Sequence, residues 1–217
     1  MITAIILAAG KSTRLNQKIP KQFFRINGNM ILHFSVKKFE KNVDAIIIVV
    51  PSRWKEKIQN EYPHHNVIIG GESRKESSYN GLIACNKKTS KVLIHDAARP
   101  FINNQLIINC INKLNDFDAV STVIKPNDTI VTMNDNIIEN VLLRKHCRLE
   151  QTPQAFIYDV ILKAHQKIKD NTTDDISVAH KAGIKCSTVE GFYNNFKITT
   201  EIDLNFAKLI LKNTQQI

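Results

Sequence analysis

The sequence predicts an α/β protein with a doubly wound, mostly parallel sheet and helices on both faces. Two observations predict this fold. Short apolar runs of the kind found in fully buried strands recur along the chain, as in residues 4–7 and 45–50. Stretches with apolar residues at helical spacing separate these runs, and strands that alternate with helices of this length are typical of βαβ units.

Each element is expected from its own local pattern. Residues 45–50 are rich in β-branched side chains, which favour strands, whereas residues 30–39 place apolar side chains at helical spacing. The expected strands cover residues 4–7, 45–50, 66–69, 91–94, 119–124 and 184–190. The expected helices cover residues 30–39, 54–62, 77–85, 105–114, 158–169, 174–182 and 202–211. Ligands of open parallel sheets bind beyond the carboxyl ends of the strands, so the segments after Leu7, Ile69 and Ile94 matter most.

Residues 125–143 interrupt this alternation. Two apolar segments, residues 129–133 and 137–141, flank Asn134-Asp135-Asn136, which is a turn-forming sequence. This pattern predicts a β-hairpin arm protruding from a single domain that spans residues 1–217. Because an isolated hairpin is marginally stable in water, we expect the arm to pack on a partner subunit in a homodimer.

The amino-acid composition restricts the classes of function that this protein can have. The 217 residues are 43% hydrophobic and 23% charged, as in ordinary globular proteins. A net charge of +10 suits anionic ligands, but the lysines are dispersed and lack interleaved aromatics, which argues against nucleic acid. The four cysteines lack zinc-ligand spacing, and no targeting or membrane segment is visible. We therefore expect a cytoplasmic protein with neither nucleic acid nor a membrane as partner.

The first strand leads into a segment suited to a polyphosphate. The small residues Ala8, Ala9 and Gly10 let a backbone approach a ligand closely, and cations follow them at Lys11, Arg14, Lys18 and Lys21. The spacing matches neither the P-loop nor the dinucleotide-binding fingerprint. A strand followed by an ordinary basic surface loop is the alternative.

A second group of candidate ligand-binding residues follows the strand that ends near Ile94. The hexapeptide His95-Asp96-Ala97-Ala98-Arg99-Pro100 places a carboxylate and a guanidinium at the edge of the sheet where ligands bind. A strand-end ion pair or a helix N-cap is the ordinary role of such an aspartate.

Together these segments resemble the family of 2-C-methyl-D-erythritol 4-phosphate cytidylyltransferases and their ribitol-phosphate relatives. The resemblance covers the chain from Ile5 to Leu211. Beyond the hexapeptide it rests on motifs that occur in the family's order: A-A-G-x-x-x-R-L with P-K-Q at 8–22, G-G-x-x-R-x-x-S at 70–77, Q-T-P-Q-x-F at 151–156, T-D-D at 173–175 and V-E-G followed by N-x-K-x-T-T at 189–200.

The resemblance implies an enzyme that transfers CMP from CTP to 2-C-methyl-D-erythritol 4-phosphate in non-mevalonate isoprenoid precursor synthesis, releasing pyrophosphate. Residues 173–175 resemble this branch. Arg-x-His at 144–146 and Lys-Ile-Thr-Thr at 197–200 resemble the branch that uses D-ribitol 5-phosphate for surface polymers, so that acceptor stays an alternative. A nucleotide sensor without catalysis could dispense with Lys21 or Lys197, and both are present.

The resemblance also implies residue roles. The catalytic cations are Arg14, Lys21 and Lys197. The nucleotide-binding residues are Ala8, Ala9, Gly10, Gly71, Ser77 and Ala97. The substrate-binding residues are Asp96, Arg99, Arg144, Thr152 and Thr173, with Arg144 entering the site of the neighbouring subunit. The expected cofactor is Mg²⁺, held mainly by the triphosphate and without dedicated protein ligands.

Physical chemistry independently favours such a site. A phosphate monoester has a second pKa of about 6, so the nucleophile is already an oxyanion at neutral pH and needs no general base. The difficulty is the repulsion between two polyanions, which cations and backbone N–H groups offset. For each lysine the ordinary alternative is simple solvation, and for each threonine it is helix capping.

Overall fold

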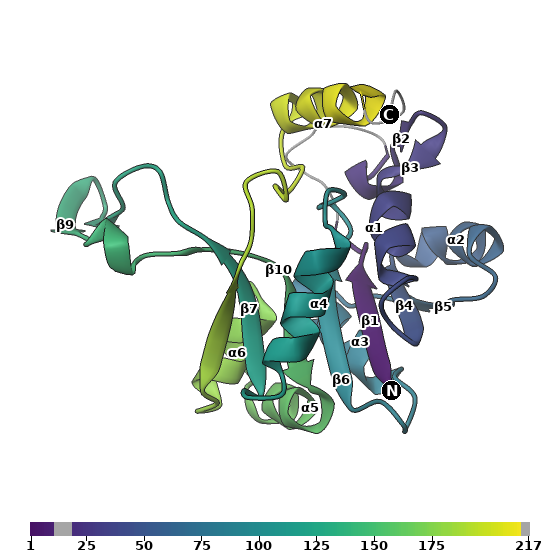
Figure 1. Cartoon of the computed structure of the whole chain (residues 1–217), viewed down its shortest axis with the longest axis horizontal. Coiled ribbons are helices and arrows are strands. Elements are labelled where there is room, and N and C mark those ends of the chain that lie inside the picture. Colours follow the sequence, from purple (N-terminus) through teal and green to yellow (C-terminus); the bar gives the residue numbers. More distant parts are fainter. Residues whose placement is uncertain (11–18, 214–217) are drawn as a thin grey trace.

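A seven-stranded sheet forms the centre of the computed structural model, which describes residues 1–10 and 19–213. The strand order is β11-β7-β10-β6-β1-β4-β5 (Figure 1). The strands are β1 (Ile2–Leu7), β4 (Ala45–Val50), β5 (Asn66–Ile69), β6 (Lys91–Asp96), β7 (Ala119–Ile124), β10 (Leu149–Ile157) and β11 (Cys186–Glu190). The predicted fold class is confirmed, since every neighbouring pair that excludes β10 is parallel.

Strand β10 was missing from the sequence prediction. It lies antiparallel between β6 and β7, and its central residues are buried. No strand was expected there because the apolar pattern is interrupted by Gln151, Thr152, Pro153 and Gln154. The side chains of Gln151, Thr152 and Gln154 can be buried because each forms hydrogen bonds inside the fold.

Alternation along β1 divides the core into two layers. Ala4 and Ile6 point to one face of the sheet, and Ile5 and Leu7 point to the other. The first face is covered by α1 (Ile31–Phe39), α2 (Lys55–Glu61) and α4 (Asn104–Lys113). The second face is covered by α3 (Arg74–Ile83), α5 (Tyr158–Lys167) and α6 (Asp175–Lys181) (Figure 1).

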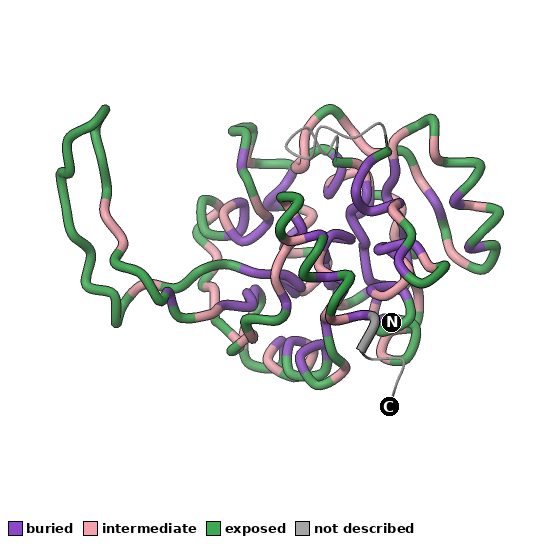
Figure 2. Tube along the Cα trace, turned by 90° about the horizontal axis from the view of Figure 1, so that it is seen from above, coloured by how far each residue is buried: buried purple, intermediate pink, exposed green. Residues whose placement is uncertain are grey.

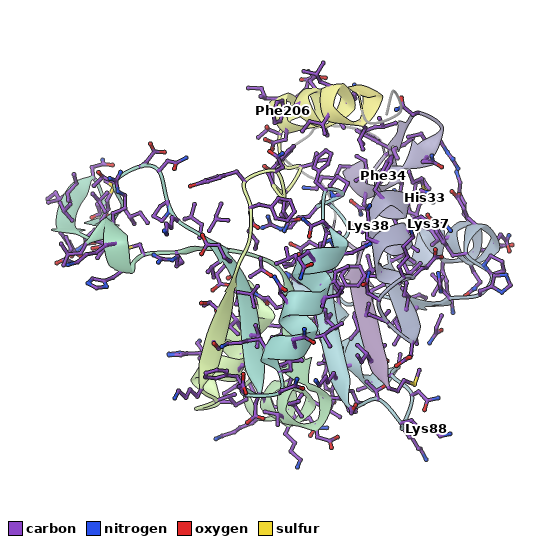
Figure 3. All side chains as sticks on the ribbon, viewed as in Figure 1. His33, Phe34, Lys37, Lys38, Lys88 and Phe206 are labelled. Carbon is purple, nitrogen blue, oxygen red and sulfur yellow. The ribbon has the colours of Figure 1, made fainter. Side chains whose placement is uncertain are left out.

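The C-terminal helix α7 (Glu201–Asn213) lies across the end of the molecule where the parallel strands finish (Figure 1). It packs with β2 (Arg25–Ile26) and the start of α1 in a third apolar cluster, and β2 pairs with β3 (Asn29–Met30). Phe34 on α1, labelled in Figure 3 together with Phe206 on α7, packs against this cluster. The short 3₁₀ helices are η2 (Lys21–Phe23), η3 (Ser52–Trp54) and η4 (Arg144–His146). No helix in residues 1–10 and 19–213 is long and apolar enough to cross a bilayer.

Helix α3 begins three residues earlier than the sequence prediction. Ser73 is its N-cap and accepts a hydrogen bond from the backbone N–H of Glu76. The Glu76 carboxylate accepts in return from the backbone N–H of Glu72. The spacing of Ser73 and Glu76 is that of a capping box, a signal visible in the sequence. The difference matters because it makes Arg74 the first residue of the helix, at the ligand-binding edge of the sheet.

The predicted hairpin is confirmed as β8 (Val131–Asn134) and β9 (Ile137–Val141). A two-residue loop joins the strands, and Asp135 has a φ of 49°, a left-handed conformation that aspartate tolerates. The arm projects from the body and is exposed along most of its length (Figure 2). Ile137 is 72% exposed and Leu143 is 67% exposed. The arm thus presents apolar side chains that the described part of this chain does not cover.

The packing of β10 predicts that Phe156→Ala destabilises the fold by about 3–5 kcal/mol, the usual cost of removing a buried phenyl ring. Phe156 is fully buried between β6 and β7. The matched control is Ile202→Ala on α7, where the side chain is 80% exposed and the expected change is within about 0.5 kcal/mol. Guanidinium unfolding followed by circular dichroism measures both, and equal effects would contradict the assigned core.

Candidate active site

A cleft of about 390 Å³ opens where β1, β5 and β6 end. Seven residues predicted from the sequence line it: Ala9, Gly10, Lys21, Gly71, Ser77, Asp96 and Lys197. It also contains residues absent from the prediction, namely Leu7, Gln22, Glu72, Ser73, Arg74 and Ala98. A second cavity, of about 450 Å³, lies near Met1, His64 and Asn66 and contains none of the predicted residues.

Small residues allow the walls of the cleft to approach closely. A Cβ on Gly70 would lie 2.5 Å from the Cβ of Ala9 and 2.7 Å from the Oγ of Ser77, so this position admits no side chain without displacement. The hydroxyl of Ser77 accepts a hydrogen bond of 3.1 Å from the backbone N–H of Gly71. Ser77 therefore fixes the glycine loop in addition to lining the cleft.

Gln22 shapes the segment after β1. Its Nε2 donates to the carbonyl oxygens of Ala8 (2.6 Å) and Gly10 (3.0 Å). The backbone N–H of Ala8 donates to Val49 O, and that of Ala97 donates to Leu7 O. The N–H groups of Ala8 and Ala97 are thus used within the sheet, and neither residue lines the cleft. Their neighbours Ala9 and Ala98 line it instead.

Asp96 is the central anion of the cleft. Its Oδ2 lies 2.7 Å from the Nζ of Lys197, and its Oδ1 lies 3.3 Å from the Nε of Arg74. Burial acts to raise the pKa of Asp96, but the positive charges of Arg74, Lys197 and Arg99 outweigh it and hold the pKa well below its usual range. Asp96 is therefore ionised at neutral pH and shared between two cations from distant parts of the chain.

Arg74 is the main site residue that sequence reasoning missed. Besides Asp96 it contacts Asp175, whose Oδ2 lies 2.8 Å from its Nη1. Burial acts to lower the pKa of Arg74, but Asp175 and Asp96 raise it further above its already high value. Its Nη2 is buried and has no hydrogen-bond partner among the described residues. The G-G-x-x-R-x-x-S motif contained the signal for this residue.

Thr152 is buried and holds Asp96 through the backbone. Its Oγ accepts from the N–H of Asp96 (3.1 Å), and it donates to the Nδ1 of His95 (3.1 Å). His95 in turn donates from Nε2 to Arg99 O. Thr152 is absent from the cleft lining and holds Asp96 from behind it, and its direct contact with substrate stays a prediction.

Two further predicted residues lie outside the lining. The guanidinium of Arg99 donates to the carbonyls of Asn195 (2.8 Å) and Glu150 (3.4 Å), which ties the segment before α7 to the start of β10. Thr173 is exposed. The expected alternative of helix capping falls to its neighbour Asp174, which is the N-cap of α6 and accepts from the N–H of Ser177.

Of the remaining two predicted residues, Arg144 is absent from the lining of this cleft. Arg14 lies outside the described residues. Arg144 lies at the base of the arm, where it is exposed and donates to Asn127 O. Together with Lys125, Lys145 and Arg148 it lines a basic cavity of about 480 Å³.

The donor set of the cleft fits a weakly held metal. Both oxygens of Asp96 already bind cations, and no group of three His, Cys, Asp or Glu side chains suited to a metal occurs in the described part of the chain. A magnesium ion there would need most of its oxygen ligands from phosphates and water, as Mg²⁺ prefers.

Known proteins resemble this chain along almost its whole length. The profile of the family described as 2-C-methyl-D-erythritol 4-phosphate cytidylyltransferase matches residues 2–213. A protein of that name from Thermotoga neapolitana is 39% identical, with both chains covered completely. One from Clostridium novyi is 41% identical over 97% of this chain and 96% of its own.

Solved structures agree with the sequence comparison. The crystal structure of 4-diphosphocytidyl-2C-methyl-D-erythritol synthase from Anaerococcus prevotii superposes with a TM-score of 0.85 at 30% identity, over 97% of this chain and 98% of that one. The Francisella tularensis 2-C-methyl-D-erythritol 4-phosphate cytidylyltransferase gives a TM-score of 0.81 at 30% identity, with 96% and 98% covered.

The buried hydrogen-bond chain through His95 predicts a loss of stability in acid. Burial lowers the pKa of His95 to about 4, whereas an unfolded histidine titrates near 6.5. Between these values only the unfolded chain binds the proton, so stability falls as the pH falls. This histidine alone should cost about 2 kcal/mol between pH 7 and pH 5. Comparing unfolding free energies of the wild type and His95→Gln at both pH values isolates this contribution, and equal pH dependence would contradict it.

Proposed function

Because the chain belongs to the family of 2-C-methyl-D-erythritol 4-phosphate cytidylyltransferases, we propose that its cleft joins CMP from CTP to 2-C-methyl-D-erythritol 4-phosphate. The enzyme is a CTP-dependent nucleotidyltransferase. The observation that carries the proposal is that Lys21 and Lys197, from opposite ends of the chain, line one cleft at the carboxyl ends of the strands.

The reaction requires charge neutralisation more than proton transfer. A phosphate oxygen of the acceptor attacks the α-phosphorus of CTP, a new P–O bond forms, and the bond to pyrophosphate breaks. The acceptor phosphate is ionised at neutral pH, so no proton need be removed from it. Described residues of the cleft supply three cations, Lys21, Arg74 and Lys197, which oppose the repulsion between the phosphates.

Lys197 is the cation best placed to change partners. Its side chain is 34% exposed and pairs with Asp96, while Arg74 holds the other oxygen of the same carboxylate. When phosphates enter, Lys197 can turn to them without leaving Asp96 as an unpaired buried charge. Lys21 and the backbone around Gly10 and Gly71 line the same cleft and would contact the phosphates of the nucleotide.

Bound Mg²⁺ would supply further neutralisation of the charge on the triphosphate. We propose that the triphosphate holds most of its coordination sphere, because Asp96 is already shared between Arg74 and Lys197. The residues of this chain therefore act mainly by binding phosphates and orienting them.

We further propose that the enzyme is a homodimer formed through the arm. Support comes from the exposed apolar residues of the arm, including Met133, Ile138 and Val141, whose burial against a second copy would be favourable. Arg144 at the base of the arm then reaches the acceptor phosphate in the partner's cleft. All four cysteines are free thiols, which supports our placement of the enzyme in the reducing cytoplasm.

The direct test is pyrophosphate release with each nucleoside triphosphate against a panel of polyol phosphates. We expect turnover with CTP and 2-C-methyl-D-erythritol 4-phosphate in the presence of Mg²⁺.

Lys197→Ala should lower kcat by about 100-fold or more while CTP affinity changes less, because the lysine neutralises charge at the reacting phosphates. Equal losses in kcat and in CTP affinity would restrict Lys197 to ground-state binding.

The outcome for the acceptor is equally decisive. Preference for D-ribitol 5-phosphate would move the enzyme to the polymer branch of the family. Release of pyrophosphate with no acceptor specificity, or none at all with any pair of substrates, would contradict the proposed reaction.

The shared site predicts rescue in mixed dimers. Arg144→Ala and Lys21→Ala homodimers should each be inactive. In a mixed dimer, one cleft retains its own Lys21 and receives the intact Arg144 of its partner. Random assortment should restore about a quarter of wild-type activity, since half of the dimers are mixed and each has one complete site. Coexpression with two different affinity tags followed by activity assay measures this.

The control pair is Lys21→Ala with Lys197→Ala. Both lysines line the same cleft of one subunit, so no cleft in a mixed dimer of these variants has both. Rescue by this control pair, or its absence for the Arg144 pair, would eliminate the shared site.

A further inference from the structure

Asp175 lies behind the active-site cleft as a buried anion that the proposed reaction does not use. It is the first residue of α6 and is 0% exposed. Its Oδ1 accepts from the Oγ of Ser78 (2.5 Å) and lies 3.0 Å from the Nε2 of His165. Since a carboxylate only accepts, His165 carries its proton on Nε2. The Oδ2 of Asp175 accepts a hydrogen bond from Arg74.

The backbone next to this carboxylate is also held by hydrogen bonds. The Oε1 of Gln154, on β10, accepts from the N–H groups of both Asp175 (3.0 Å) and Ile176 (3.2 Å). The N-terminus of α6 is thereby attached to the central sheet. Burial acts to raise the pKa of Asp175, but Arg74, His165 and Ser78 lower it to about 2, so the group is an anion at neutral pH.

Arg74 connects this buried anion to the cleft. It holds Asp175 through Nη1 and Asp96 through Nε, and Asp96 holds Lys197. The charges along this row alternate in sign from Asp175 to Lys197. A lysine in place of Arg74 would offer one point charge, whereas the planar guanidinium reaches both carboxylates in a fixed geometry.

We propose that Asp175 is a positioning residue that holds Arg74 against the wall of the cleft, so that Arg74 secures Asp96 while Lys197 engages the phosphates. The inference rests on the proposed nucleotidyl transfer. Asp175 itself touches neither substrate. It acts through Arg74, which lines the cleft and whose buried Nη2 has no hydrogen-bond partner within residues 1–10 and 19–213.

The physical reason is competition for Arg74. Without the charge of Asp175, the guanidinium would lose the stronger of its two ion pairs, 2.8 Å against 3.3 Å. It would then move toward Asp96 or toward the incoming phosphates. Either movement changes how Asp96 holds Lys197, and displacements of about 1 Å in a catalytic group cost orders of magnitude in rate.

A buried ion pair can also serve only the fold, and kinetics separates the two roles. The experiment compares kcat for pyrophosphate release in the wild type, Asp175→Asn, Arg74→Met and the double variant, at temperatures where circular dichroism shows each to be folded. We expect Asp175→Asn to lower kcat by about tenfold or more. In the Arg74→Met background the same substitution should change kcat by less than about threefold, because the two residues act as one unit.

The matched control is Asp170→Asn. This carboxylate lies five residues before Asp175 and pairs with Lys181 on the surface, so its loss should leave kcat within about twofold of the wild type. Wild-type kcat in folded Asp175→Asn, or equal losses in both backgrounds, would overturn the proposal. An inactive wild type would instead contradict the proposed reaction.

Ser78→Ala decides the question if Asp175→Asn does not fold. It removes one donor to Asp175 and preserves both charges. A loss of about threefold in kcat that disappears in the Arg74→Met background would support the positioning role. Wild-type kcat, or a loss that persists in that background, would overturn it.

Discussion

The carboxylate of Asp96 at the end of β6 is the interaction on which the arrangement of the cleft depends. A buried charge is costly unless paired, and this one is paired twice, by Arg74 from the start of α3 and by Lys197 from the segment before α7. The three segments therefore meet at one point for an electrostatic reason. The same pairing keeps two cations beside the cleft before any phosphate arrives, which is the pre-organisation that catalysis of phosphoryl transfer requires.

The antiparallel strand β10 extends this organisation through the sheet. Thr152 on this strand accepts from the backbone of Asp96, and Gln154, two residues later, accepts from the backbone of Asp175. One strand thus fixes both anions that flank Arg74. Glutamine is mostly exposed in proteins, yet Gln151 and Gln154 are buried on this strand because both form hydrogen bonds within the fold.

The body and the arm carry different residues of the proposed site. The body supplies a cleft with Lys21, Arg74 and Lys197, whereas Arg144 lies at the base of an arm that projects away from it (Figures 1 and 2). An exposed apolar hairpin is unfavourable for an isolated chain and favourable once a second copy covers it. Assembly and completion of the site would then be one event, which links activity to protein concentration.

The sequence by itself determined the parallel sheet, the hairpin and seven residues of the cleft. Buried strands, turns and short motifs can each be recognised from residues that are close together in the chain. It did not reveal β10, since polar residues conceal its burial, or the ion pair of Arg74 with Asp175. Those two residues are 101 positions apart, and each alone resembles a solvated surface charge. Only the tertiary structure decided that they face each other, because the partner of a buried charge is set by the packing of helices on the sheet. Local periodicity specifies which face of an element is buried, and says nothing of what lies opposite.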